Sequence, residues 1–447
     1  MKNSMAHAGI RRAALAGTVS VAALAALWLG RAGPTQATSS AAPALAVPTP
    51  SAHSFYATAF EKRPDAAKLT ALGRQLFFEP ALSASGRMSC ASCHDPAHAY
   101  APANGLAVQT GGIALKTPGL RAVPSLMYAQ DAPPFSEHFS DTDGDDSVDQ
   151  GPTGGRGWDG RASSAHEQAA IPLLSPFEMA NAGVADVVRR LRGSASASAF
   201  RAAFGEHVLA DERKTWTGLL WSLEVFQQSP TEFYPYSSKY DAFLRGQASL
   251  AAEERRGLGV FNDPRRGNCA QCHPSGVKRG ALPQFTDRGL VAIGVPRNPS
   301  IAANANPAFH DLGLCGPLRQ DLAAHLEYCG LFKTPTLRNV ATRRAFFHNG
   351  VFHRLEDVID FYADRDAHPE RFYERGRLGS ARSFDDLPAS HATNVNIDPP
   401  FGRRPKGAPS PLNRRDRADL LTFLRTLTDG YQPSPGASAG AAMPTRS

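Results

Sequence analysis

Two copies of the pentapeptide Cys-x-x-Cys-His carry the most informative chemistry in this chain of 447 residues. They are Cys90-Ala91-Ser92-Cys93-His94 and Cys269-Ala270-Gln271-Cys272-His273. Such a pair of thiols bonds to the vinyl groups of a c-type haem, and the histidine that follows binds the iron. A structural zinc site would need further ligands nearby, and none pairs naturally with either motif. The spacing therefore predicts two covalently bound haems c, with His94 and His273 as iron ligands.

Residues 1–37 have the pattern of a secretory signal peptide. Basic residues at positions 2, 11 and 12 precede an Ala- and Leu-rich run, and Ala37 offers a small residue for cleavage. The run is short for a membrane span, so we expect cleavage and no stable membrane insertion. Export also suits covalent haem attachment, and we expect the mature protein to be periplasmic.

The net charge of +7 does not indicate a nucleic-acid partner. Four basic residues leave with the predicted leader, and no acidic residue leaves with them: they are Lys2, Arg11, Arg12 and Arg31. The propionates of two haems would offset most of the charge that remains. We therefore expect no nucleic acid partner.

The residues before each motif predict the elements that present it. Apolar residues recur at helical spacing over residues 65–77, and again over residues 253–261 before the second motif. A helix, a turn and then the motif is how a cytochrome c domain begins, and the repeat indicates a distant duplication. Further helices are predicted at 184–192, 216–227 and 414–427, with no long alternating strand pattern. The predicted fold class is mainly α, with two cytochrome c-like haem domains packed across an interdomain interface.

Composition suggests where these domains begin and end. Residues 38–54 are rich in Ala, Pro, Ser and Thr and are expected to form a flexible linker. We assign residues 55–245 to an amino-terminal haem domain and residues 246–432 to a carboxyl-terminal haem domain. The Pro-, Gly- and Ala-rich residues 433–447 are expected to be a disordered tail.

Cys315 and Cys329 lie outside the haem motifs. An oxidising compartment favours a disulfide between them, and the alternative is two free buried thiols. The bond would close a loop of about 15 residues, for which the chain-entropy model gives about 3 kcal/mol of stabilisation.

The sixth iron ligand decides what each haem does. A haem with two strong axial ligands passes electrons, whereas one with an open position can activate peroxide or oxygen. After His273 the only methionine is Met443 in the tail, so a His/Met pair is nearly excluded for the second haem. The candidates in its own half are His310, His325, His348, His353 and Tyr362, and spacing alone does not choose among them.

Three segments resemble the bacterial di-haem cytochrome c peroxidase and MauG-like superfamily. They are Leu76-Phe77-Phe78-Glu79-Pro80-Ala81-Leu82-Ser83-Ala84-Ser85-Gly86, Trp158-Asp159-Gly160-Arg161-Ala162 and Lys333-Thr334-Pro335-Thr336-Leu337-Arg338-Asn339-Val340. The resemblance extends over nearly the whole mature chain. It implies that the amino-terminal haem is the peroxidatic centre and that the carboxyl-terminal haem transfers electrons.

The resemblance also implies residues that act on peroxide. After Trp-Asp-Gly-Arg the family has a Gln, a Pro four residues later and a Glu ten residues later; this chain has Gln168, Pro172 and Glu178. Glu178 then moves a proton between the two peroxide oxygens, Gln168 hydrogen-bonds them, and Pro172 crowds the sixth site. Trp158 is similar to the tryptophan that passes charge between the haems. Without the resemblance, Glu178 would be a solvated helix carboxylate, Gln168 a surface residue and Trp158 a core anchor.

For the second haem, the family places the distal ligand fourteen residues after the His of a Phe-His-x-Gly element. Here that element is Phe347-His348-Asn349-Gly350, and the ligand position is Tyr362. Standard peroxidases carry Met there and MauG-like members carry Tyr, so the resemblance implies a Tyr362 ligand. A phenolate lowers the reduction potential relative to a thioether. The alternative is a core tyrosine, because Leu355, Val358, Ile359 and Tyr362 share one helical face.

Two departures from the family bear on the first haem and on calcium. Standard peroxidases supply a distal His from the loop after the first motif, but residues 99–124 contain no His and His98 is too close to His94. We therefore expect a first haem that is open without reductive activation. The family's Asn ligand to an interdomain calcium is replaced by Ala122, and the acidic loop 141–146 lacks the closing Glu of a calcium loop. Calcium binding therefore stays open.

Three functions remain. The favoured one is a periplasmic peroxidase that reduces hydrogen peroxide with electrons from a small cytochrome c or cupredoxin. A second is MauG-like oxidation of a residue in a partner protein, which Tyr362 and the missing distal His favour. A third is a non-enzymatic di-haem electron carrier in which Met127 or Met179 closes the first haem. On a helix, Met179 would point about 100° away from Glu178, so one segment could hardly present both to the iron.

Overall fold

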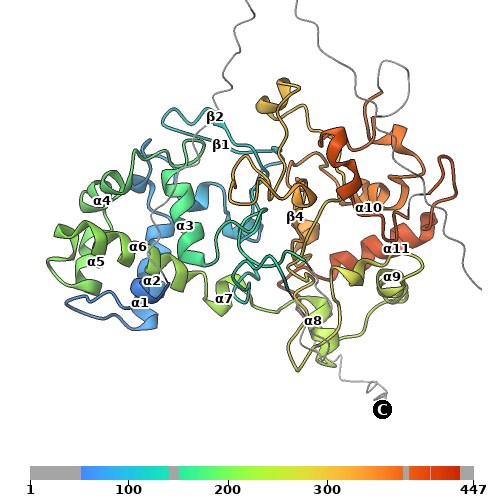
Figure 1. Cartoon of the computed structure of the whole chain (residues 1–447). Coiled ribbons are helices and arrows are strands. Elements are labelled where there is room, and N and C mark those ends of the chain that lie inside the picture. The colour runs from blue at the N-terminus through green and yellow to red at the C-terminus, as the bar shows by residue number, and fades with distance from the viewer. Residues whose placement is uncertain (1–51, 140–150, 376–381, 403, 433–447) are drawn as a thin grey trace, which may run out of the picture. The chain divides into compact units, whose positions relative to one another are not determined.

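The structure is a computed structural model that describes residues 52–139, 151–375, 382–402 and 404–432 (Figure 1). The predicted leader, most of the predicted linker, the acidic loop 141–146 and the tail from residue 433 lie outside the described residues. The helices are α1 Ala52–Tyr56, α2 Ala66–Phe77, α3 Ala165–Leu174, α4 Val184–Arg192, α5 Ala197–Phe204, α6 Glu212–Phe226, α7 Pro230–Phe233, α8 Lys239–Leu244, α9 Ala252–Asn262, α10 Leu355–Asp364 and α11 Arg414–Arg425. The predicted mainly helical architecture is confirmed.

The strands in the described ranges are two residues long and form two antiparallel pairs. In the first pair, β1 (Thr110–Gly111) lies against β2 (Thr117–Pro118). In the second, β3 (Leu290–Val291) lies against β4 (Phe332–Lys333). None of the helices in these ranges is both long and apolar enough to cross a bilayer.

In the amino-terminal half, α2 and α6 pack side by side (Figure 1). The Asp65 carboxylate begins α2 by accepting a hydrogen bond from the Lys68 amide at 2.8 Å, as expected of a helix N-cap. A Cβ at Gly73 would lie 2.0 Å from the carbonyl oxygen of Ser222 in α6. Glycine therefore allows the two helix backbones to touch directly before the first haem motif.

The carboxyl-terminal half repeats this crossing with α9 and α11, which also lie next to each other (Figure 1). The Asn413 side chain caps α11 by accepting from the Asp416 amide at 3.0 Å. A Cβ at Gly257 of α9 would lie 2.0 Å from the carbonyl oxygen of Asp419. Each motif is thus preceded by a helix whose glycine contacts the backbone of a later helix, which is the repeat that the sequence indicated.

Two main apolar clusters lie under these helix pairs. One contains buried side chains between Phe55 and Phe233, and the other contains buried side chains between Tyr240 and Leu427. Tyr240 belongs to α8, so the second cluster begins slightly before residue 246, where we expected the second domain to begin. Hydrogen bonds join the two halves, among them one from the Tyr128 hydroxyl to Asp429 at 2.8 Å.

Two predicted boundaries differ from the structure for local reasons. Helix α1 begins at Ala52, inside the segment to residue 54 that we expected to be flexible, and Phe55 is buried with its ring stacked on His166 at 3.8 Å. This stacking anchors the start of the domain. Helix α6 begins at Glu212 rather than at 216, because the Asp211 carboxylate accepts a hydrogen bond from the Lys214 amide at 2.9 Å.

Cys315 and Cys329 form the expected disulfide, fourteen residues apart in sequence. Replacing both with alanine should lower the free energy of unfolding by about 3 kcal/mol, because the unfolded chain regains the freedom of a closed loop of about 15 residues. Urea unfolding of the oxidised protein and the double variant measures this. Equal stability of the two proteins, with the bond verified by mass spectrometry in the first, would contradict the expectation.

Candidate haem sites and the residues between them

Both haem motifs are built alike in the structure. Each begins with a single 3-10 turn, Cys90–Ser92 in the first and Cys269–Gln271 in the second. His94 donates its Nδ1 hydrogen to the carbonyl oxygen of Tyr100 at 3.0 Å, and His273 donates its Nδ1 hydrogen to that of Phe285 at 2.8 Å. This leaves Nε2 of each ring to bind a metal, and the carbonyl fixes the ring orientation.

The surroundings of the motifs fit a haem in two further respects. Burial lowers the pKa of His94 to about 4, so its imidazole is neutral at physiological pH, as an iron ligand must be. Cys315 and Cys329 pair with each other, which leaves the four motif cysteines for the haems. The motif thiols are therefore available for thioether bonds to two haems.

Glu178 lies in a turn beside the first motif. We expected a helix at this position, but α3 ends at Leu174 and residues 176–179 form a turn. The cause is local, because Pro176 disfavours the helical conformation of the residue before it. The carbonyl of Glu178 accepts a hydrogen bond from the Gly112 amide at 2.8 Å, so the strand pair β1–β2 holds this turn.

The half-buried Glu178 side chain faces the thiols of the first motif closely enough that its negative charge raises the pKa of Cys93. Burial raises the pKa of Glu178 itself, against the opposing effects of a hydrogen bond from Ser175 and the positive charge of Arg161. A carboxyl group in such a setting exchanges protons more readily near neutral pH than an exposed one does.

Gln168 and Pro172 are half-buried residues of α3, the helix that leads into the Glu178 turn. The Ser164 hydroxyl caps this helix by accepting from the Glu167 amide at 3.1 Å. The carbonyl of Pro172 accepts a hydrogen bond from the Met179 amide at 3.0 Å, so helix and turn are tied together. The three residues that the resemblance pointed to therefore come from one connected segment, while their roles stay predictions.

Other side chains that could close the first haem are engaged elsewhere. The Met127 sulfur accepts a hydrogen bond from the Asn339 amide group at 3.5 Å, and Met179 is buried in the apolar cluster of the amino-terminal half. His98 pairs with Asp95 at 2.9 Å. Each of these three side chains is thus held by another part of the protein.

Trp158 is held between the two halves of the protein. Its indole Nε1 donates to the carbonyl oxygen of Ala122 at 2.7 Å, and its own carbonyl accepts from the Lys333 amide at 2.8 Å. Ala122 stands where the family has a calcium-binding Asn, and here its carbonyl instead positions the indole. The described residues contain no cluster of His, Cys, Asp or Glu suited to a metal ion.

A buried ion network surrounds this tryptophan. The Arg121 guanidinium lies 2.7 Å from Asp159 through Nη1, and its Nε lies 2.6 Å from Asp311 of the other half. Arg161 also pairs with Asp159, at 3.0 Å. The Asp159 side chain is fully buried and that of Arg121 is 6% exposed, so the pKa of Asp159 lies well below its usual value because of these two arginines, in spite of burial.

Tyr362 of α10 lies beside the second motif. Burial raises the pKa of its phenol, and the charges that Cys272 and Cys269 would carry as thiolates raise it further, which places the hydroxyl near both sulfurs. Its ring stacks on Phe401 with centroids 5.3 Å apart. Tyr362 is therefore a residue near the second motif that could bind the iron of a haem held there, although ligation by Tyr362 stays a prediction.

The competing histidines have protein partners. The His348 ring stacks on Phe332 with centroids 3.5 Å apart, and its Nε2 lies 3.2 Å from an Asp386 oxygen. His353 lies 3.1 Å from the Arg344 carbonyl oxygen through Nδ1. His310 lies 3.1 Å from the Asp386 carbonyl oxygen, and His325 is stacked on Tyr328.

Two cations near the first motif are not among the site residues predicted from the sequence. Arg161 was part of the Trp-Asp-Gly-Arg element, yet no role was assigned to it, although its charge reaches Glu178. Arg343 comes from the carboxyl-terminal half, and its charge acts on His94 of the amino-terminal motif. Arg161 was detectable from its place in a recognised motif, whereas Arg343 reaches the site only through tertiary packing.

Comparison with known proteins decides the family. A family model described as di-haem cytochrome c peroxidase matches residues 67–249. The methylamine utilization protein MauG of Paracoccus denitrificans (strain Pd 1222) is 38% identical over 316 residues, which are 68% of this chain and 76% of that protein. This chain belongs to the di-haem cytochrome c peroxidase and MauG family. The chain is therefore an oxidoreductase, and membership of this family implies two haems.

Other relatives agree with this assignment. The cytochrome c551 peroxidase of Nitrosomonas europaea is 25% identical over 298 residues, covering 66% of this chain and 73% of that protein. The crystal structure of the diheme peroxidase BthA from Burkholderia thailandensis E264 matches with a TM-score of 0.72 and 37% identity, over 87% of this chain and 93% of that one. The family fold of two cytochrome c-like domains is thereby confirmed.

Gly111 of β1 should be required for the position of Glu178 in this family member. A Cβ at Gly111 would lie 2.2 Å from the Phe177 carbonyl oxygen and 2.7 Å from the Glu178 Cα, so Gly111→Ala must displace the turn. We expect peroxide turnover to fall by about 10- to 100-fold with haem content unchanged. Gly276→Ala is the control, because nothing lies within 4 Å of its Cβ position. Stopped-flow assays compare them, and equal rates would show that the turn is not held by Gly111.

Proposed function

We propose that this enzyme reduces hydrogen peroxide to water in the periplasm, at the haem bound by the first motif, with electrons relayed through the second haem. The observation that carries the proposal is an asymmetry between the motifs. A carboxyl group, Glu178, lies beside the first pair of thiols, and a phenol, Tyr362, lies beside the second pair. One site thus has a group that moves protons, and the other has a group that can close the coordination of iron.

When bound, haem supplies an iron that accepts peroxide and exchanges electrons one at a time. Glu178 takes a proton from one peroxide oxygen and returns it to the oxygen that leaves as water. Gln168 donates a hydrogen bond to the substrate, and Pro172 limits the space above it. The overall reaction consumes two electrons and two protons for each peroxide and yields two waters.

Trp158 is the proposed path for electrons between the two sites. The Ala122 carbonyl holds its indole, and the Lys333 amide from the other half holds its backbone. These two hydrogen bonds limit the motion of both the backbone and the oxidisable ring of Trp158. Arg121 stiffens the same region, because it pairs both with Asp159 of its own half and with Asp311 of the other half.

The proposal is tested with purified holoenzyme, hydrogen peroxide and a reduced small cytochrome c or cupredoxin. We expect two donor molecules to be oxidised for each peroxide consumed, with no need for prior reduction of the enzyme. Donor oxidation that requires a reductive pretreatment would contradict the open first haem. No peroxide-dependent donor oxidation with any small redox protein would reject the peroxidase assignment.

A second candidate is oxidation of a residue in a partner protein, as an alternative use of the same peroxide step. The placement of Tyr362 beside the second motif favours it, because an anionic oxygen ligand stabilises oxidised iron. A peroxide-treated enzyme that oxidises small cytochromes at once and retains no long-lived oxidised state would argue against this candidate.

Tyr362→Met tests the part that this residue plays. If Tyr362 ligates the second haem, a thioether in its place should raise the midpoint potential of that haem. Spectroelectrochemical titration of the variant measures the shift. Tyr373→Met is the matched control, because Tyr373 is a buried tyrosine of the same small apolar cluster whose hydroxyl bonds to the Gly294 carbonyl. The same potential in all three proteins would identify Tyr362 as a core residue only.

A further inference from the structure

Three half-buried cations that act electrostatically on one another lie near the backbone of Trp158. They are Arg156, Arg288 of the loop before β3, and Lys333 of β4. Burial first, and then the positive charges of Arg288 and Arg156, together lower the pKa of Lys333 to about 7. Burial and the charge of Arg288 likewise lower the pKa of Arg156. Like charges gathered in a low-dielectric interior repel one another strongly, so this cation cluster is unfavourable unless an anion neutralises it.

The protein itself supplies little neutralisation. The Lys333 ammonium donates to the Gly155 carbonyl oxygen at 2.7 Å, and the Arg156 Nη2 donates to that of Ala129 at 2.8 Å. The buried Arg156 Nε has no hydrogen-bond partner. In the part of the chain that the structure describes, no carboxylate is recorded within 4.0 Å of either residue, whereas Arg288 pairs with the half-exposed Asp131 at 2.6 Å.

The acidic groups at longer range are already committed to other partners. Glu224 acts on Arg156, but its carboxylate accepts hydrogen bonds from the Tyr56 hydroxyl at 2.7 Å and lies 3.1 Å from His166. Asp159 acts on Lys333, but it is held by Arg121 and Arg161. The cation cluster therefore has an excess of positive charge and an unused donor, and both point to an anionic ligand.

The position of the cluster indicates which anion it meets. The Lys333 amide is bonded to the Trp158 carbonyl, and Arg288 follows Asp287, whose amide donates to the carbonyl of Cys272 in the second motif at 2.9 Å. The cluster thus lies between the proposed relay residue and the second haem motif. A haem bound there carries two carboxylates on one edge, and a guanidinium with a free Nε–H is suited to a carboxylate.

We propose that Arg156, Arg288 and Lys333 form a binding site for a carboxylate, and that its occupant is a propionate of the second haem. The inference rests on the two haems that family membership implies, and it is independent of peroxide turnover. Binding a propionate relieves the repulsion among the cations and keeps Lys333 protonated. In return, the positive charges favour the reduced state of the nearby iron, which has one positive charge fewer.

Lys333→Met in the holoprotein tests this site. We expect the midpoint potential of the second haem to fall while that of the first stays the same, and we expect the propionate bending band in the resonance Raman spectrum to shift. A fall confined to the first haem would overturn the assignment. Lys333→Arg should keep the wild-type potential, because it keeps the charge. Arg156→Gln should reproduce the fall, which provides a second variant if Lys333→Met fails to fold.

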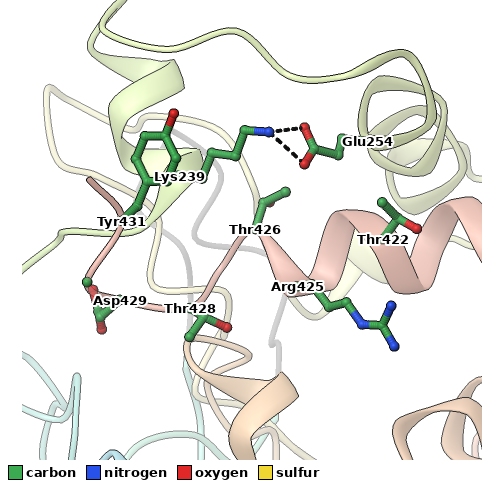
Figure 2. A pocket seen from close by; sticks show the side chains of 9 residues that line it. Lys239, Glu254, Thr422, Arg425, Thr426, Thr428, Asp429 and Tyr431 are labelled. Carbon is green, nitrogen blue, oxygen red and sulfur yellow. Dashed lines mark hydrogen bonds and ion pairs between the residues drawn. The ribbon is translucent and has the colours of Figure 1, made fainter. Parts of the chain in front are cut away.

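Lys239→Met is the matched control, because it removes the same charge at a distance from the cluster. Lys239 lines a surface pocket and pairs with Glu254 at 2.7 Å, as Figure 2 shows. A potential that changes equally in Lys239→Met and Lys333→Met would overturn the proposal, as would no change in either.

A second experiment distinguishes a propionate from a free anion. The wild-type potential should not respond to added chloride, phosphate or acetate. A response that Lys333→Met abolishes would assign the site to a free anion instead. A loss of peroxide turnover alone would bear on the proposed function and not on this site.

Discussion

Replacing Glu178 with glutamine should lower kcat/KM for peroxide by about 10²- to 10⁴-fold, which is the usual contribution of a positioned acid–base group. The amide keeps the size and hydrogen-bonding capacity of the side chain but cannot take up and release a proton. Because the Glu178 turn is held by its own backbone bond to Gly112, the variant should retain its fold and both haems. Stopped-flow kinetics with a saturating electron donor measures the loss.

The pH profile provides a second measure of the same group. Burial raises the pKa of Glu178 above the ordinary glutamate value, so the proton-accepting form is lost as the pH falls through this raised pKa. The wild-type kcat/KM should therefore decline on the acidic side, and this decline should be absent in Glu178→Gln. Glu167→Gln on the neighbouring helix α3 is the control and should retain turnover. Full activity in Glu178→Gln would remove this residue from the mechanism.

Replacing Arg121 with glutamine should destabilise the protein by about 3–5 kcal/mol, the usual effect of removing one partner from a buried ion pair. Arg121 pairs with two carboxylates whose side chains are almost completely buried, Asp159 at 0% exposure and Asp311 at 8%. Without it, Asp311 loses a bidentate partner and Asp159 keeps only Arg161. Urea unfolding at pH 7 measures the change.

The loss of stability caused by Arg121→Gln should increase with pH. In the wild type, Asp159 has a pKa below its usual value, so it stabilises the fold above an ordinary aspartate pKa of about 4 and that contribution is lost at lower pH. In the variant, Asp159 loses one of the two arginines that lower its pKa, so this pKa should rise and protonation should relieve the buried charge as the pH falls. The stability difference between the two proteins should therefore be larger at pH 7 than at pH 5.

An exposed ion pair provides the comparison for Arg121. Arg425 lies 3.5 Å from Glu356, with side chains 60% and 40% exposed, and Arg425→Gln should change the unfolding free energy by less than about 1 kcal/mol. If Arg121→Gln costs no more than Arg425→Gln, the network around Trp158 does not hold the two halves together. Slower donor oxidation in Arg121→Gln, with each haem spectrum unchanged, would indicate that the network also positions the relay.

Local signals in the sequence were sufficient to predict the helices that present the haem motifs. The predicted helix at 184–192 coincides with α4, and those before the motifs agree with α2 and α9 within one residue at each end. Apolar spacing and capping residues such as Asp65 act over a single turn, so they are visible in a short window. The turn at Glu178 was also within reach, because Pro176 marks the end of α3, but a helix was assumed there.

The charged groups between the haem sites could not be predicted in the same way. Arg121 and Asp311 are separated by 190 residues, and only tertiary packing brings them together. The same holds for Arg156, Arg288 and Lys333, which come from three separate segments. In the sequence, each residue looks like an ordinary surface cation. Only the folded structure brings the three positive charges together, where their repulsion favours binding of an anion.

The most direct test of the account is the spin state of the two ferric irons in the purified holoprotein, measured by electron paramagnetic resonance at low temperature. We predict one high-spin haem, whose open position would lie beside Glu178, and one low-spin haem, which Tyr362 would close. Two low-spin haems in equal amounts would contradict it, because no position would remain at which peroxide could react, and the protein would then be an electron carrier.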